Sequence, residues 1–213
     1  MAFLKNDHES YPGACARVSF VSRLAGELCS SVDKQLEHLS SKYGAPRQLT
    51  LELPSLDFPP VSRRRHGEVC MAILRPSGGF LLQTKASYPG SVMRLPTGGI
   101  QKGEAIEDAL LREIWEETNL EVDVARFVAA IRYSDSKRVS RFCTYLFFTR
   151  ETSGVLQSND PGEKITEWVE AKPAELPDYA SKQRDSVPSW SNWGRFRAMA
   201  MDVLLEDCNN HGL

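Results

Sequence analysis

Apolar residues recur with helical spacing near the beginning of the chain and again near its end. The first stripe is formed by Val21, Leu24, Ala25, Leu28, Val32, Leu36 and Leu39, and Gly44-Ala45-Pro46 then ends the pattern. The second stripe is formed by Phe196, Met199, Ala200, Val203 and Leu204, with Ser191 or Asn192 as the N-cap. Each pattern predicts a helix. We expect the first helix to dock on the rest of the protein, with a dimer contact or a lid as the alternative.

Shorter stretches between these helices are continuously apolar or rich in β-branched and aromatic residues, which is typical of strands. The predicted strands span residues 68–74, 80–85, 94–97, 126–133, 141–149 and 165–170, and residues 48–58 form a further strand or extended arm. Residues 76–79 (PSGG) predict a hairpin turn. Residues 171–190 contain three widely spaced prolines and are expected to form an irregular crossing.

The segment that follows Gly98 and Gly99 carries crowded carboxylates. At about 100° per residue, Glu113, Glu116 and Glu117 fall within roughly a 100° arc of a helix. The apolar residues one to two turns earlier point in nearly the same direction, so the acids are expected to face inward or into a cleft.

Like charges at this spacing cost a helix about 0.2–0.5 kcal/mol per pair, so a cation is expected beside the acids. Carboxylate oxygens suit a hard divalent ion, and Mg²⁺ or Mn²⁺ is therefore the expected cofactor. Taken alone, the helix is also compatible with a solvated acidic face.

The spacing of residues 98–120 resembles the signature of the Nudix hydrolases. That signature is Gly-x5-Glu-x7-Arg-Glu-U-x-Glu-Glu-x-Gly-U, where U is a bulky aliphatic residue, and here it runs from Gly98 through Glu104 and Arg112 to Leu120. One position departs from it, because Asn119 stands where the family has glycine. The departure is mild, since a residue that ends a helix in the left-handed conformation is usually glycine but sometimes asparagine.

The resemblance implies an α/β fold, a Nudix-type α/β/α sandwich with a mixed β-sheet. It does not cover the first 60 or so residues, so we expect an N-terminal extension with an amphipathic helix at residues 1–60. The Nudix domain, including the C-terminal helix, would then span residues 61–213.

The resemblance also implies a metal-dependent hydrolase that cleaves a diphosphate linkage in a nucleoside diphosphate linked to another group. The implied metal ligands are Glu116, Glu117 and the carbonyl of Thr97, and Glu113 would either bind metal or hold the attacking water. Arg112 would orient Glu113 through a salt bridge.

The general base stays open, because family members carry it either in the box or on a downstream loop. Glu113, Glu163 and Glu167 are the candidates, and Glu163 is slightly preferred because it lies on the loop side of its strand. The alternative is that Glu163 and Glu167 are ordinary surface acids without a role in the reaction.

Four residues are candidates for contacts with substrate. Gly98 and Gly99 would let the backbone come close to ion and substrate. Arg94 precedes the box, and Arg65 belongs to a basic run before the first predicted strand; arginine forks match phosphate oxygens. The more ordinary interpretation of that run is a solvent-exposed segment at the start of a strand.

Composition narrows the class of protein. The chain has 213 residues, 41% of them hydrophobic and 25% charged, and a formal charge of −2, which argues against bulk nucleic-acid binding. Five scattered cysteines without a C-x-x-C motif indicate reduced thiols and a cytoplasmic location. No apolar run is long enough for a membrane span. The expected partner is a small nucleoside diphosphate derivative, and a homodimer is compatible with the N-terminal helix.

Other functions of the same fold are kept as alternatives. A catalytically silent sensor of nucleotide derivatives would usually have lost box acids, whereas every acid is present here. An isomerase of isoprenoid diphosphates would need a catalytic cysteine, for which Cys70 is the candidate. Trp190 and Trp193 either anchor the core or offer a platform for a base.

Overall fold

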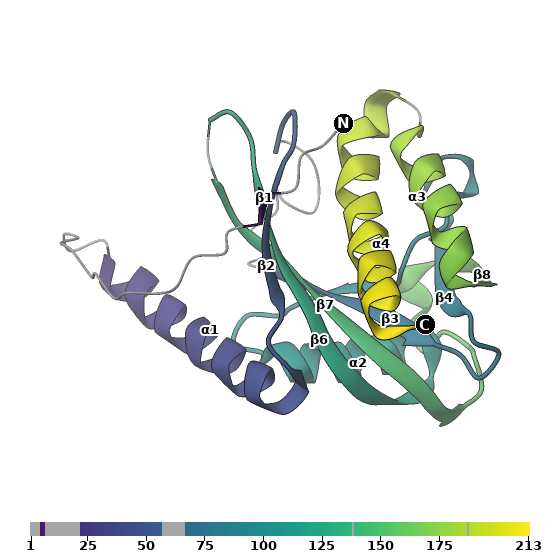
Figure 1. Ribbon diagram of the computed structural model, residues 1–213, viewed down its shortest axis with the longest axis horizontal. Coiled ribbons are helices and arrows are strands. Elements are labelled where there is room, and N and C mark those ends of the chain that lie inside the picture. The colour runs from purple at the N-terminus through teal and green to yellow at the C-terminus, as the bar shows by residue number, and fades with distance from the viewer. Residues whose placement is uncertain (1–4, 7–21, 57–66, 138, 187) are drawn as a thin grey trace.

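The computed structural model describes residues 5–6, 22–56, 67–137, 139–186 and 188–213. A mixed β-sheet lies between two layers of helices (Figure 1). The strands are β1 (Lys5–Asn6), β2 (Arg47–Glu52), β3 (Gly67–Leu74), β4 (Phe80–Lys85), β5 (Thr97–Gly99), β6 (Leu120–Ser134), β7 (Val139–Gly154) and β8 (Ile165–Ala171). The helices are α1 (Ser22–Tyr43), α2 (Ile106–Thr118), α3 (Leu176–Arg184) and α4 (Ser191–His211). This arrangement confirms the predicted α/β/α sandwich with a mixed sheet and an N-terminal helix.

The sheet has the strand order β1-β2-β6-β7-β3-β4-β8, and β5 pairs with the first half of β3. The pairs β2–β6 and β3–β7 are parallel, and the other pairs are antiparallel. Strand β2 comes from the expected N-terminal extension and pairs with β6 along its whole length. This part of the extension is therefore joined to the sheet.

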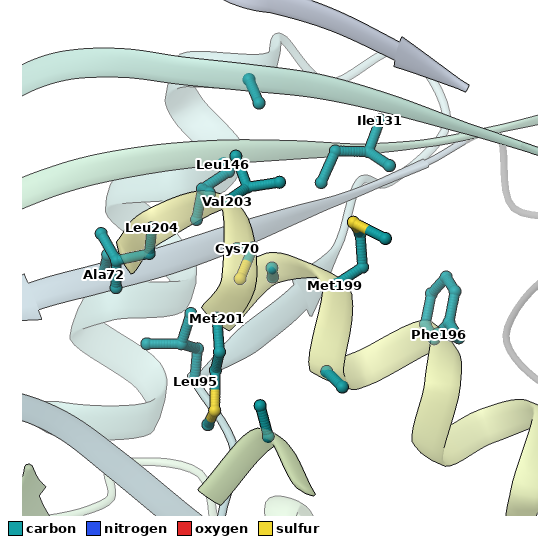
Figure 2. Close-up of a cluster of buried hydrophobic side chains, with 14 of the residues drawn as sticks. Cys70, Ala72, Leu95, Ile131, Leu146, Phe196, Met199, Met201, Val203 and Leu204 are labelled. Atoms are coloured by element: carbon teal, nitrogen blue, oxygen red, sulfur yellow. The ribbon is translucent and has the colours of Figure 1, made fainter. Parts of the chain in front are cut away.

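Alternation along the strands gives each face of the sheet its own core. Val69, Met71 and Ile73 of β3 pack in the cluster that contains the apolar residues of α2. Cys70 and Ala72 of the same strand pack in the cluster that contains α4. Figure 2 shows this second core, in which apolar side chains of α4 approach the sheet. Both faces of β3 are buried, which explains the apolar run from Val69 to Leu74.

Helix α1 is docked against the start of α2. Its Gln35 Oε1 accepts a hydrogen bond from the backbone amide of Ile106, at 2.9 Å. Lys42 Nζ and Tyr43 Oη donate to Glu107 Oε1 at 2.7 and 2.5 Å. The N-cap residue of α2, Ala105, provides no side-chain cap, so Gln35 satisfies an amide that would otherwise lack a partner. The docking expected for the first helix is what the structure shows.

Several local predictions were wrong. Residues 176–184 form helix α3 inside the expected crossing. Pro177 lies in the first turn of this helix, where a missing amide costs no hydrogen bond. The N-cap of the last helix is Trp190, not Ser191 or Asn192. Trp190 ends a 3₁₀ turn (Pro188–Trp190) and forms no side-chain cap. The strand expected at residues 94–97 is displaced to Thr97–Gly99.

The two tryptophans at the entrance of α4 pack inward. Trp193 is buried, and its ring centroid lies 5.0 Å from that of Tyr88. Trp190 meets Trp193 edge to face at 5.1 Å. This packing favours core anchoring over a stacking platform.

Among the helices that the structure describes, none is long and apolar enough to cross a membrane.

Gly194 allows the close contact between α3 and α4. A Cβ atom at this position would lie 1.9 Å from the carbonyl oxygen of Gln183. We therefore expect Gly194→Ala to lower the free energy of unfolding by about 1–3 kcal/mol, although alanine gains about 1 kcal/mol of helix propensity. Urea denaturation measures the change. Asn209→Ala, on the exposed surface of the same helix, is the control and should stay within about 0.5 kcal/mol; equal stability of the two variants would contradict this packing.

Candidate active site

Helix α2 brings three acids of the box to one face. Glu117 is fully buried and Glu113 nearly so, whereas Glu116 is partly exposed. Gly98 in β5 allows Glu113 to lie there, because a Cβ at position 98 would come within 1.9 Å of Glu113 Cδ. The pairing of Gly98 with Val69 fixes β5 to the sheet at this point. The close approach of strand and helix therefore requires glycine.

Arg112 connects the acids of the box to one another. Its Nε and Nη2 donate to the two oxygens of Glu104, at 2.6 and 2.9 Å. Its Nη1 donates to Glu113 Oε1 and to Glu116 Oε2, both at 2.8 Å. Nη2 also donates to the Gly99 carbonyl at 3.1 Å. The guanidinium thus binds three acids and joins the helix to the Gly99 carbonyl. Its hydrogen bond to Glu104 lowers the pKa of that carboxyl.

Two residues of β4 contact Glu117, and the sequence interpretation missed both. Lys85 Nζ lies 2.7 Å from Glu117 Oε1 and also binds Glu163. Gln83 Nε2 donates to Glu117 Oε2 at 2.7 Å. The available signal was that Gln83 and Lys85 stand two positions apart in a predicted strand, because such residues share one face.

Burial and neighbouring charges shift the pKa values of these acids. Loss of solvent raises the pKa of Glu117 to about 7, against the opposing charges of Lys85 and Arg94. Burial also raises the pKa of Glu113, although Arg112 opposes it. Burial alone would raise the pKa of Glu163, but its hydrogen bond to Lys85 and the charge of that lysine lower it below its usual value.

Arg94 lies inside the protein. Its side chain is 3% exposed, and it donates to Tyr88 Oη, to the Leu95 carbonyl and to Thr97 Oγ1 at 2.7, 2.8 and 2.7 Å. This geometry suits support of Thr97, the residue before Gly98, better than a contact with substrate. Thr97 itself is buried.

Of the remaining candidates that the structure describes, only Glu163 lies close to the acids of α2. Glu163 ends a 3₁₀ turn (Pro161–Glu163) and meets Lys85 and Glu117. Glu167 is exposed on β8, opposite Thr84. Arg65, with the basic run around it, lies outside the described residues.

The acids are divided between two cations. Glu113 and Glu116 bind Arg112, and Glu117 and Glu163 bind Lys85. In this arrangement no three His, Cys, Asp or Glu side chains of the described residues lie close enough to hold one metal ion. The oxygen donors themselves fit Mg²⁺ or Mn²⁺, and Lys85 supplies a positive charge between two of them.

Comparison with known proteins identifies the family. A family model described as the NUDIX domain matches residues 64–190, more than half of the chain. The chain is 33% identical over 61 residues to an RNA pyrophosphohydrolase of Cereibacter sphaeroides, which is 29% of this chain and 38% of that protein. The chain thus spans well under half the length of the curated relatives it matches.

Solved structures show only a loose similarity. A Nudix hydrolase from Nitrosomonas europaea aligns with a TM-score of 0.46 and 18% identity, over 68% of this chain and 90% of that one. An ADP-ribose pyrophosphatase from Streptococcus suis aligns with a TM-score of 0.44 and 18% identity, over 66% and 90% of the two chains. The assignment therefore rests on the family model and on the box residues gathered on α2, and together these show that the chain belongs to the Nudix family.

Proposed function

We propose that this protein is a divalent-metal-dependent hydrolase that cleaves a diphosphate linkage in a nucleoside diphosphate linked to another group. The observation that carries the proposal is that Glu113, Glu116 and Glu117 share one face of α2, where Lys85 also joins Glu117 to Glu163, an acid from a distant loop. Family membership supports pyrophosphate hydrolysis, and the curated relatives are named as RNA pyrophosphohydrolases.

In the proposed reaction, Glu116, Glu117 and the Thr97 carbonyl would hold the metal, with Glu113 as a further ligand or as the holder of the attacking water. A bound divalent ion neutralises phosphate charge and lowers the pKa of water. Arg112 fixes Glu113 and Glu116 in place through its two hydrogen bonds, so it acts as a support.

Glu163 is the preferred general base among the three candidates. It lies beside Glu117 on a loop, and Lys85 keeps it ionised by lowering its pKa. A base must be deprotonated before the reaction, and Glu163 meets that condition. Because a lowered pKa also weakens a base, the position of Glu163 beside Glu117, and not its base strength, is what supports the choice. Glu113 stays an alternative, whereas the exposed position of Glu167 gives that residue less support.

The alternative functions have less support. A sensor would not need the full set of box acids with their arginine support. An isomerase would need a reactive cysteine, but Cys70 is fully buried in the core beneath α4, and burial raises its pKa to about 12. A thiol in such surroundings is inert.

The first test is hydrolysis of a substrate panel with and without Mg²⁺. The panel contains ADP-ribose, dinucleoside polyphosphates, nucleoside triphosphates, capped RNA and 5′-triphosphorylated RNA, and phosphate release is coupled to a phosphatase. We expect metal-dependent turnover of one member and a loss of about 10²–10³-fold in Glu117→Gln, because a buried charge that binds the metal is removed.

Asp108→Asn is the matched control, because Asp108 is an exposed acid on the same helix. Its activity should equal that of the wild type. Absence of turnover on every member, together with tight binding of one of them, would favour the sensor function instead.

Lys85→Met tests whether the lysine competes with metal. Without Lys85, the buried Glu117 and its neighbour Glu163 lose their counter-ion, so the metal-free protein should lose up to about 3–5 kcal/mol of stability. Mn²⁺ should then raise the melting temperature more in the variant than in the wild type, as followed by scanning calorimetry. The exposed Lys102→Met serves as control. An equal or smaller Mn²⁺ effect in Lys85→Met would contradict competition.

The raised pKa of Glu117 predicts a pH dependence of metal binding. A metal needs the ionised carboxylate, so Mn²⁺ affinity should fall about tenfold per pH unit below pH 7 and level off above it. The folded state holds this proton more tightly than the unfolded state, so metal-free stability should fall as pH rises from about 4.5 to 7. Titrations followed by Mn²⁺ paramagnetic resonance measure the affinity. Wild-type affinity that does not change between pH 5.5 and 8 would contradict the assignment.

A further inference from the structure

The segment of residues 155–164, called here the 155–164 loop, lies against the C-terminal end of α2. The backbone amides of Asn159 and Asp160 donate to the Glu116 carbonyl at 2.8 and 3.2 Å, and that of Gln157 donates to the Thr118 carbonyl at 3.1 Å. Carbonyls at the end of a helix lack partners within the helix, so the loop satisfies them. The docking is therefore specific to the end of the helix that carries the acids.

Asn119 stands at the junction of this helix and the loop. Its backbone is left-handed, with φ 55° and ψ 23°, as expected for a residue that replaces glycine at the end of a helix. Glycine would adopt this conformation without cost. The backbone conformation therefore does not require asparagine, and what asparagine adds to glycine at this position is its side chain.

The side chain of Asn119 bridges the start and the middle of the loop. Its Nδ2 donates to the Val155 carbonyl at 3.0 Å, and its Oδ1 accepts from Asn159 Nδ2 at 2.9 Å. Asn159 Nδ2 also donates to the Trp115 carbonyl at 3.0 Å. The side chain of Val155 is 73% exposed, so polar contacts rather than burial hold the first residue of the loop.

The other end of the loop carries Glu163 to the acids. Asp160 Oδ1 accepts from the Gly162 amide at 2.7 Å and so closes the turn that ends at Glu163. The Ala86 amide then donates to the Lys164 carbonyl at 3.1 Å, next to Lys85. The loop is thus held on the end of α2 through several hydrogen bonds and again at Ala86, just after β4, and Glu163 lies between these two attachments.

We propose that Asn119 is a positioning residue, which holds the 155–164 loop on α2 so that Glu163 stays at Lys85 and Glu117. This inference rests on the proposed function, in which Glu163 serves the reaction. Asn119→Gly restores the residue that the family signature has, keeps the backbone conformation and removes both side-chain bonds. Freed of them, the loop samples more conformations, and Glu163 spends less time at the site.

The test compares wild type, Asn119→Gly, Glu163→Gln and the double variant on the substrate that the wild type turns over. We expect kcat of Asn119→Gly to fall about tenfold with little change in KM, as for the loss of a supporting hydrogen bond. The double variant should be no slower than Glu163→Gln alone, because both changes act through Glu163.

Hydrogen exchange provides a readout that does not depend on turnover. The amides of Gln157, Asn159 and Asp160 should exchange faster in Asn119→Gly, while its melting temperature stays within about 4 °C of the wild type. Unchanged exchange at these amides would overturn the proposal, and so would an equal fold-loss of kcat from Glu163→Gln in the wild-type and Asn119→Gly backgrounds. An inactive wild type would contradict the proposed function itself, and exchange would then still decide whether Asn119 holds the loop.

Discussion

Several carboxylates are crowded into one small region of the protein, and two of them, Glu113 and Glu117, are buried. Each buried anion needs a counter-charge, and the protein supplies two, Arg112 from α2 and Lys85 from β4. Arg112 is held by its fork on Glu104 and by the Gly99 carbonyl. Lys85 emerges at the end of a strand buried on both faces. The two cations come from different elements, so the site exists only when helix and sheet are assembled.

The surrounding fold serves to keep α2 fixed against the sheet. At its start, Gln35 of α1 satisfies the Ile106 amide. At its end, the 155–164 loop satisfies the Glu116 and Thr118 carbonyls. Between these points, the apolar face of α2 packs on the sheet, and Gly98 lets Glu113 come close to β5. Such support limits movement of the acids, which is what a catalytic site built on rigid elements requires.

The sequence predicted the parts of the site whose residues share one helix. Spacing alone put Glu113, Glu116 and Glu117 on one face, and the family signature implied the bond from Arg112 to Glu113, which the structure contains. The left-handed backbone at Asn119 was likewise predicted. These features depend on the local geometry of the backbone, which is nearly the same in every α-helix.

Features that depend on contacts between distant segments were not predictable. In the sequence, Lys85 and Gln83 look like ordinary polar residues of a strand. Their contacts with Glu117 exist only because β4 is paired in the sheet and α2 packs on it. The same holds for Arg94, whose sequence position beside the box suggested phosphate contact but whose side chain points into the protein. Helix α3 was not predicted because of Pro177. A proline in the first turn of a helix looks the same in sequence as a proline in a loop.

A crystal structure of the protein with Mn²⁺, together with the anomalous scattering of that ion, would test whether these acids form a divalent-cation site. We expect an anomalous peak about 2 Å from carboxylate oxygens of Glu116 and Glu117, with Lys85 moved away from Glu117. A map without a peak near these acids, in which Lys85 still binds Glu117 and Glu163, would contradict it.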